Sequence, residues 1–149
     1  MAARLGAVLA AAALGALATV ASGHADGTEA KPTLTVRGSA FGRILFDGSG
    51  RALYAFTRDP RGGRSTCYGA CATAWPPYVK RAALVAGAAV RRSLIGTTRR
   101  RDGRLQVTYA GRPLYYYVGD RKPGQVLCQN VREFGGLWLV QRASGRLVR

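Results

Sequence analysis

A ten-residue stretch occurs twice in this chain, and this repetition constrains the fold more than any other feature. Its first copy is GRALYAFTRD at 50–59, and its second copy, 61 positions later, is GRPLYYYVGD at 111–120. When residues 42–67 are aligned with residues 103–128, nine of the 26 pairs are identical. Two copies are too few for a solenoid, which needs three or more repeats. We therefore expect an all-β fold in which two pseudo-symmetric, hairpin-rich repeats pack as a small sandwich or barrel.

Short apolar segments around the repeats have the pattern of β-strands separated by turns. Leu34 and Val36 alternate with polar neighbours, and the turn sequence DGSG separates two apolar runs. These two runs predict a β-hairpin over residues 42–56. The predicted strand segments are 34–36, 44–46, 53–56 and 137–140.

One segment of the first repeat has a different periodicity. Cys67, Cys71 and Trp75 recur at i, i+4 and i+8, which is one face of a helix, and two prolines follow. This spacing predicts a short helical turn near 67–75. Residues 80–93 are rich in Ala, Val and Arg, and we expect a loop with a strand fragment there.

The N-terminal residues have the organisation of a secretory signal peptide. Arg4 precedes an apolar run at 5–20, and small residues then lead to an A-x-A-like site, which predicts cleavage near Ala25. The run is short for a membrane span of about 20 residues, although an uncleaved anchor is the alternative. No cysteine lies near this site, so we expect no lipid there. The predicted organisation is a signal peptide at 1–25, a flexible lead-in at 26–32 and a single β domain at 33–149, with repeats at about 33–79 and 94–149.

The chain is strongly basic, with 23 lysines and arginines against seven acids and a formal net charge of +16. Such a charge attracts a protein to anionic surfaces, so we expect anionic envelope polymers or lipid head groups as partners. The basic residues are scattered, and only 91–92 and 99–101 form runs, which is typical of a solvated surface. We expect no nucleic acid partner in a secreted protein. The sequence does not define an oligomeric state.

Each repeat carries a tyrosine, a second aromatic residue two positions later and an aspartate five positions after the tyrosine. On a strand, i and i+2 share a face, so the two aromatics lie together and the aspartate falls in the next turn. We favour a structural interpretation, in which the aromatics fill the core and the aspartate binds turn N–H groups or a buried tyrosine hydroxyl. The alternative is a hydrolase that uses both carboxylates in one cleft. These repeat-motif residues are Tyr54, Phe56, Asp59, Tyr115, Tyr117 and Asp120.

The three cysteines permit one disulfide and leave one thiol over. On a helical turn, Cys67 and Cys71 would have Cα atoms about 6 Å apart, within the disulfide range, whereas a Cys67–Cys128 bond would close a longer loop. A redox-active pair in an envelope electron-transfer accessory is the functional alternative. The C-x-x-x-C spacing and the lack of an adjacent Lys or His argue against it. Cleavage near Ala25 would also remove His24, the only histidine, so we expect no catalytic residue, metal site or cofactor.

The chain resembles a family of secreted repeats, also described as predicted lipoproteins, that is defined by a Y-x-[FWY]-x-x-D motif. Residues 54–59 (YAFTRD) and 115–120 (YYYVGD) both fit the motif, and the resemblance covers about residues 33–145. The flanks that fit are STC at 65–67 with Cys71, WPP at 75–77, DG at 102–103, QVTY at 106–109, KPG at 122–124 and Trp138.

This resemblance implies a location outside the cytoplasm, a Cys67–Cys71 pair with Cys128 as the free thiol, and Trp75 and Trp138 as structural aromatics. It implies no activity, because the family is one of unknown function. The lipid-attachment cysteine of many members is absent. We therefore expect a non-enzymatic, exported binding or structural module of the cell envelope or the extracellular space.

Overall fold

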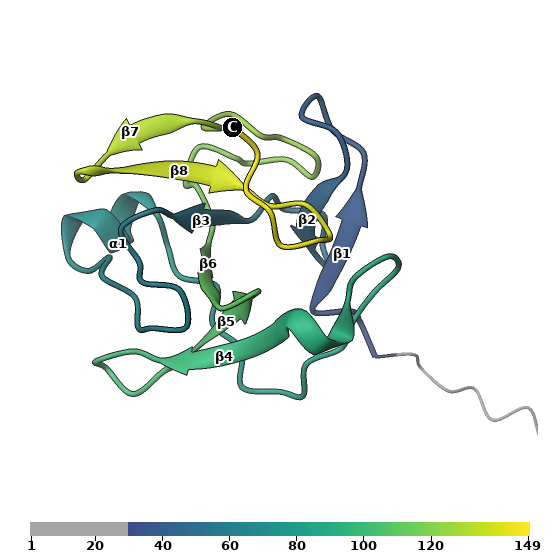
Figure 1. The fold of residues 1–149 in the computed structure, drawn as a ribbon, viewed down its shortest axis with the longest axis horizontal. Helices are drawn as coiled ribbons and strands as arrows, with labels where there is room; N and C mark the ends of the chain where they lie inside the picture. The colour runs from purple at the N-terminus through teal and green to yellow at the C-terminus, as the bar shows by residue number, and fades with distance from the viewer. Residues whose placement is uncertain (1–29) are drawn as a thin grey trace, which may run out of the picture.

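The computed structural model describes residues 30–149 of the chain, which contain eight short strands and one short α-helix (Figure 1). The predicted signal peptide and most of the predicted lead-in lie outside these residues. The elements are β1 (Leu34–Arg37), β2 (Ile44–Asp47), β3 (Tyr54–Phe56), α1 (Ala70–Ala74), β4 (Ile95–Arg99), β5 (Leu105–Tyr109), β6 (Arg112–Tyr115), β7 (Val131–Glu133) and β8 (Gly136–Val140). A 3-10 turn, Arg92–Leu94, precedes β4.

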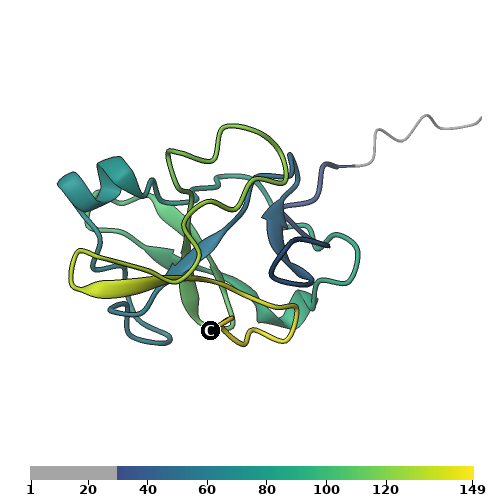
Figure 2. The ribbon, with the colours of Figure 1, turned by 90° about the horizontal axis from the view of Figure 1, so that it is seen from above.

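The strands form two antiparallel sheets. One is the β1–β2 ribbon, and the other is a six-stranded sheet in the order β4-β5-β6-β3-β8-β7. The β1–β2 ribbon and α1 lie at opposite ends of the molecule in both ribbon views (Figures 1 and 2). The predicted all-β fold is thus confirmed in its sandwich-like form, because the six-stranded sheet is not closed into a barrel.

The two repeats are interleaved rather than stacked as separate halves. The hairpin predicted over 42–56 forms only next to its turn, where the Asp47 and Leu53 N–H groups donate to the Arg51 and Leu45 carbonyls around the bridge Phe46↔Ala52. The ladder of β2 is with β1. Strand β3 instead enters the large sheet, where it pairs with β6 on one edge and β8 on the other. All three residues of β3 are buried, and pairing on both edges satisfies its backbone where water does not reach.

Strands β3 and β6 meet at the pseudo-two-fold centre of the molecule. Tyr54 and Tyr115, the equivalent tyrosines of the two copies, are directly opposed partners in this antiparallel ladder. The loop after each motif also docks on the other copy. Gly62 N–H donates to the Gly111 carbonyl over 2.7 Å, and Gly124 N–H donates to the Gly50 carbonyl over 2.8 Å.

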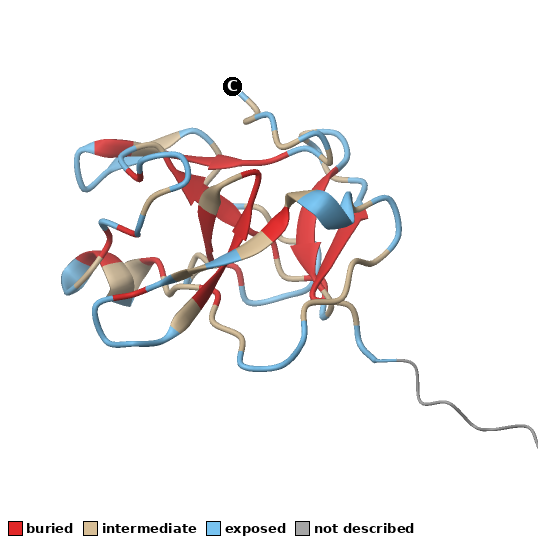
Figure 3. Cartoon of the chain, turned by 60° about the horizontal axis from the view of Figure 1, so that its bottom comes forward, coloured by how far each residue is buried: buried red, intermediate tan, exposed pale blue. Residues whose placement is uncertain are grey.

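Buried hydrophobic residues form two clusters. The buried positions, drawn in red in Figure 3, fall mainly on the strands. One cluster is rich in aromatic residues and includes Trp75, Trp138 and both disulfide cysteines. The other is mainly aliphatic and lies toward the β1–β2 ribbon, with Leu34, Leu45 and others. The predicted helical turn is present but shorter, and residues 80–91 contain no named strand or helix, only the bridge Leu34↔Ala86. Within residues 30–149, no helix has the length and apolar character that a bilayer crossing requires.

Candidate functional site

The motif tyrosines and aspartates exchange hydrogen bonds between the two repeats. The Tyr54 hydroxyl of the first copy donates to Oδ2 of Asp120 over 2.7 Å. The Tyr115 hydroxyl of the second copy donates to Oδ2 of Asp59 over 2.5 Å. All four side chains are buried, so each repeat satisfies the polar group that the other one buries.

The other oxygen of each carboxylate holds the loop that follows its own motif. Oδ1 of Asp59 accepts bonds from the N–H and the hydroxyl of Thr66, and Oδ1 of Asp120 accepts a bond from the Leu127 N–H. Both bonds span seven residues, which shows the same loop geometry in the two copies. Burial is the main cause that raises the pKa of Asp59 and of Asp120, while the tyrosine hydroxyls act in the opposite direction.

The second aromatic of each motif packs on the tryptophan of the other repeat. Phe56 stacks on Trp138 with a centroid distance of 4.2 Å, and Tyr117 lies against Trp75 at 4.8 Å. Trp75 and Trp138 stack on each other at 4.0 Å with an interplanar angle of 3°. Three rings are thus stacked and the fourth, Tyr117, packs against them at a tilt of 38°, so the second aromatic of each motif contacts the other repeat.

A buried arginine extends the polar network on one side only. Arg100 is 2% exposed, and its guanidinium donates to Oγ of Ser65, Oε1 of Gln106 and the Cys67 carbonyl at 2.7–2.9 Å. Ser65 Oγ also lies 2.6 Å from the Tyr115 hydroxyl. The interpretation of the 99–101 run as solvated surface is wrong for Arg100. Its guanidinium donates to a loop carbonyl and two neutral side chains in place of water.

Sequence reasoning missed this network because it has no counterpart in the other repeat. At a shift of 61 positions, Arg100 corresponds to Ser39 and Gln106 to Leu45. Repeat comparison therefore gave no signal for either residue. The run of three arginines was visible, but nothing in it distinguished the buried member from its neighbours.

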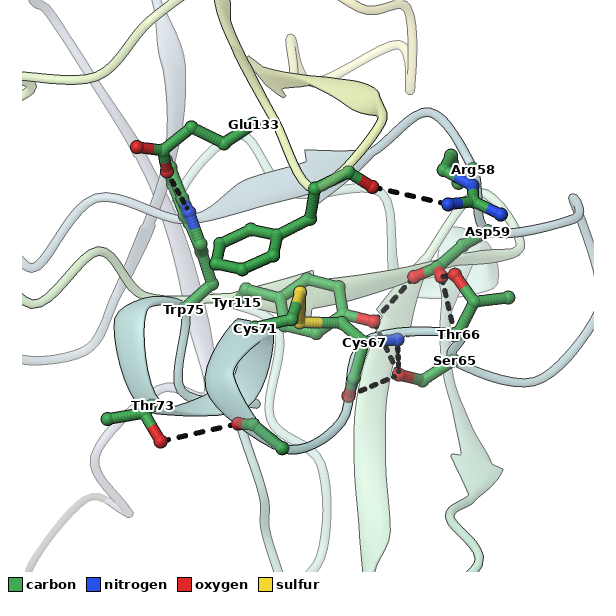
Figure 4. Close-up of a disulfide and its surroundings, with 12 residues drawn as sticks. Arg58, Asp59, Ser65, Thr66, Cys67, Cys71, Thr73, Trp75, Tyr115 and Glu133 are labelled. Carbon is green, nitrogen blue, oxygen red and sulfur yellow. Dashed lines mark hydrogen bonds between the residues drawn. A yellow bond between two sulfur atoms is a disulfide. The ribbon is translucent and has the colours of Figure 1, made fainter.

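The disulfide lies beside this network. Cys67 and Cys71 are bonded, with Cα atoms 5.3 Å apart, and both are buried. Figure 4 shows the Tyr115 ring alongside the disulfide, with its hydroxyl directed to Asp59 and Ser65. Cys128 is a free, half-buried thiol that packs against the same aromatic cluster, and burial is the first cause that raises its pKa.

The geometry of the motif residues is that of a structural centre. Neither Asp59 nor Asp120 lines the surface cavities of about 470, 360 and 290 Å³. Both carboxylates are 2–3% exposed and bonded at both oxygens, so a substrate would have to displace internal bonds to reach them. Among residues 30–149, no three His, Cys, Asp or Glu side chains form a group that could hold a metal ion.

The exposed charge is a separate feature of this molecule. Of the 23 basic residues, only Arg4 lies outside residues 30–149, which contain five of the seven acids. Within these residues the ion pairs are Arg104–Asp102 at 2.7 Å and the longer Arg100–Asp102 contact at 3.9 Å. Most of the basic side chains therefore face solvent without an acidic partner.

A family model described as a secreted repeat of unknown function matches the chain twice, at residues 35–78 and 96–141. No curated protein and no solved structure gives a significant match. The two matched segments contain the two motifs that exchange partners in the structure, and together they cover more than half of the chain. The chain therefore belongs to this family of secreted repeats.

Proposed function

We propose that this protein is an exported binding or structural module whose basic surface associates with anionic components of the cell envelope, polymers or lipid head groups. The observation that carries the proposal is that every acidic side chain of residues 30–149 is hydrogen-bonded or ion-paired within the chain. Asp59 and Asp120 accept from tyrosines, Asp47 accepts from Tyr116 and its own turn, Glu133 accepts from Trp75, and Asp102 pairs with Arg104. The positive charge is therefore left for a partner outside the chain.

Arginine suits this role because its guanidinium keeps its charge at every physiological pH and binds carboxylate or phosphate oxygens in pairs. Contacts between exposed charges weaken as salt shortens the screening length. The proposal therefore requires binding that depends on the charge of the partner and decreases with ionic strength.

Vesicles provide the direct test. The purified protein should sediment with phosphatidylglycerol-containing vesicles at low ionic strength and should be released by added salt. It should not sediment with pure phosphatidylcholine vesicles. A glycerol-phosphate polymer on a solid support repeats the test for envelope polymers. Binding that is indifferent to salt, or equal for charged and neutral vesicles, would overturn the proposal.

We also propose that export removes the signal peptide near Ala25 and that the mature chain carries no lipid. The support is the family's secreted character and the disulfide, which persists in oxidising compartments. Intact-mass and N-terminal peptide measurement on protein recovered from a secreting host tests both statements. A retained N-terminus or an added lipid mass would contradict them.

The two other candidate functions receive less support. A redox role would need an accessible, readily cycling pair, yet Cys67 is fully buried and Cys71 is 7% exposed. A hydrolase would need Asp59 and Asp120 at a shared cleft, yet both bind tyrosine hydroxyls in the interior. Neither observation favours a reaction at these residues.

A further inference from the structure

One surface cavity gathers arginines from three distant parts of the chain. Its volume is about 360 Å³, and its polar lining comes mainly from Arg61, Arg112, Arg146 and Arg149, together with Ser144. No acidic side chain lines it. Four positive groups at one cavity repel one another unless an anion lies between them.

The walls of this cavity are fixed by hydrogen bonds. On one side, Nε of Arg61 donates to the Ala110 carbonyl over 3.1 Å, beside the bond that docks Gly62 on Gly111. On the other side, the terminal segment folds back on β8. Gly145 N–H donates to the Arg142 carbonyl over 2.8 Å, and Val148 N–H donates to the Val140 carbonyl over 2.9 Å. The arginines therefore converge on a backbone that is already in place.

None of the four arginines at this cavity forms an ion pair with an acidic side chain of residues 30–149. Both ion pairs of residues 30–149 involve Asp102, which does not line it. Burial, followed by the positive charges of Arg61 and Arg149, lowers the pKa of Arg112. Half-buried Arg112 is thus held in an electropositive site that a bound anion would relieve.

The equivalent arginine of the other repeat shows what is missing here. Arg51 lies 4.1 Å from the ring centroid of Tyr116, and the Tyr116 hydroxyl donates to Oδ2 of Asp47. At the pseudo-symmetric positions around Arg112, Thr108 replaces the aspartate and Ala55 replaces the tyrosine. The first copy therefore supplies its arginine with an aromatic ring and a nearby acid, and the equivalent positions of the second copy carry neither.

From this convergence we propose that the cavity, hereafter the arginine pocket, binds a tetrahedral oxyanion of the phosphate or sulfate class, either free or carried on an envelope component. Guanidinium groups offer paired N–H donors that match the oxygens of such an anion, and Ser144 adds a hydroxyl at the rim. This inference deepens the proposed function by assigning one site and one chemical group to the basic surface.

Calorimetric titration of the purified protein with inorganic phosphate, and separately with sulfate, tests the pocket. The wild-type chain should bind one equivalent with an affinity that decreases as chloride concentration rises. The double variant Arg112→Gln/Arg146→Gln should bind at least ~10-fold more weakly, because it loses two of the four cations that face the anion. The control Arg91→Gln/Arg92→Gln removes the same charge from exposed positions outside the pocket and should stay within ~2-fold.

Thermal unfolding of both double variants shows whether they are folded before their titrations are compared. Absence of saturable phosphate or sulfate binding to the folded wild-type chain would refute anion binding at the arginine pocket. An equal loss of affinity in the two double variants would refute it as well. Binding at the pocket without any binding to charged vesicles or polymers would overturn the proposed function and leave the pocket intact. Where both occur, displacement of vesicles by inorganic phosphate assigns the pocket to lipid phosphate, and failure to displace assigns it to the free anion.

Discussion

Tyr54 donates its hydroxyl hydrogen to Asp120, a residue 66 positions later in the chain and in the other repeat. The equivalent bond of the second copy, from Tyr115 to Asp59, runs the opposite way across the same boundary. The stacked rings and the docking of the glycine loops follow the same rule. In this chain the repeated residues therefore join the two copies, because the buried tyrosine hydroxyl of each copy is bonded to the aspartate of the other.

Alkaline pH should unfold the protein together with the ionisation of its buried tyrosines. Burial is the first cause that raises the pKa of Tyr54, Tyr78, Tyr115 and Tyr116 above the ordinary value of 10.0. The unfolded chain loses these protons near pH 10 and the folded chain keeps them, so their contribution to stability is complete below pH 10 and is lost above it. Tyrosinate absorbance and circular dichroism should change in one step. Ionisation of these tyrosines near pH 10 in a folded chain would show that they are solvated.

The buried guanidinium of Arg100 should be needed for stability. Arg100→Ala leaves the Gln106 amide and the Cys67 carbonyl without their donor and should lower the unfolding free energy by ~3 kcal/mol. Arg100→Lys should recover only part of this, since an ammonium cannot reach three acceptors in the same fork. Arg101→Ala, at the exposed neighbouring position, is the matched control and should change stability by ~1 kcal/mol or less, because it loses only the contact of its guanidinium with the Tyr68 ring. Denaturant unfolding measures all three, and equal effects at 100 and 101 would refute the network.

Thiol counting should give one reactive cysteine in the unfolded, unreduced protein and three after reduction, because Cys67 and Cys71 are bonded. Replacement of both by serine should cost ~2 kcal/mol in the chain-entropy account of a small loop. Cys128→Ser is the control that keeps the bond and abolishes the reactive thiol. Three thiols without reductant, or a bond that includes Cys128, would contradict the pairing.

The parts of the fold that the sequence indicated are those with a local signal, either an apolar run or a helical spacing. Short apolar runs predicted the strands at 44–46, 53–56 and 137–140, and the structure places β2, β3 and β8 there. The partner of β3 was not predictable from the turn between 47 and 50, because local turn chemistry does not record which distant strand completes a ladder. Such a turn usually joins the two strands of a β-hairpin. Here β3 pairs with β6 and β8 in the large sheet, where its aromatic side chains are buried.

The site was predictable to the same extent. The expectation that an aspartate receives a buried tyrosine hydroxyl came from the needs of a buried polar group, and Tyr54 and Tyr115 meet that need. That each aspartate comes from the other copy could not be read from positions five residues apart. The arginine pocket was also invisible, since Arg61, Arg112 and Arg146 are far apart in the chain and have ordinary neighbours.

The most direct test of the exchanged repeats is a pair of double-mutant cycles in denaturant unfolding. Tyr54→Phe and Asp120→Asn, which lie in different copies, should show a coupling energy of ~1 kcal/mol or more, because the first removes the donor of the Tyr54–Asp120 hydrogen bond and the second replaces its charged acceptor with a neutral amide. Tyr54→Phe and Asp59→Asn, which lie in the same copy, have no hydrogen bond in common and should be additive within ~0.5 kcal/mol. Coupling within the copy and additivity between copies would contradict the account.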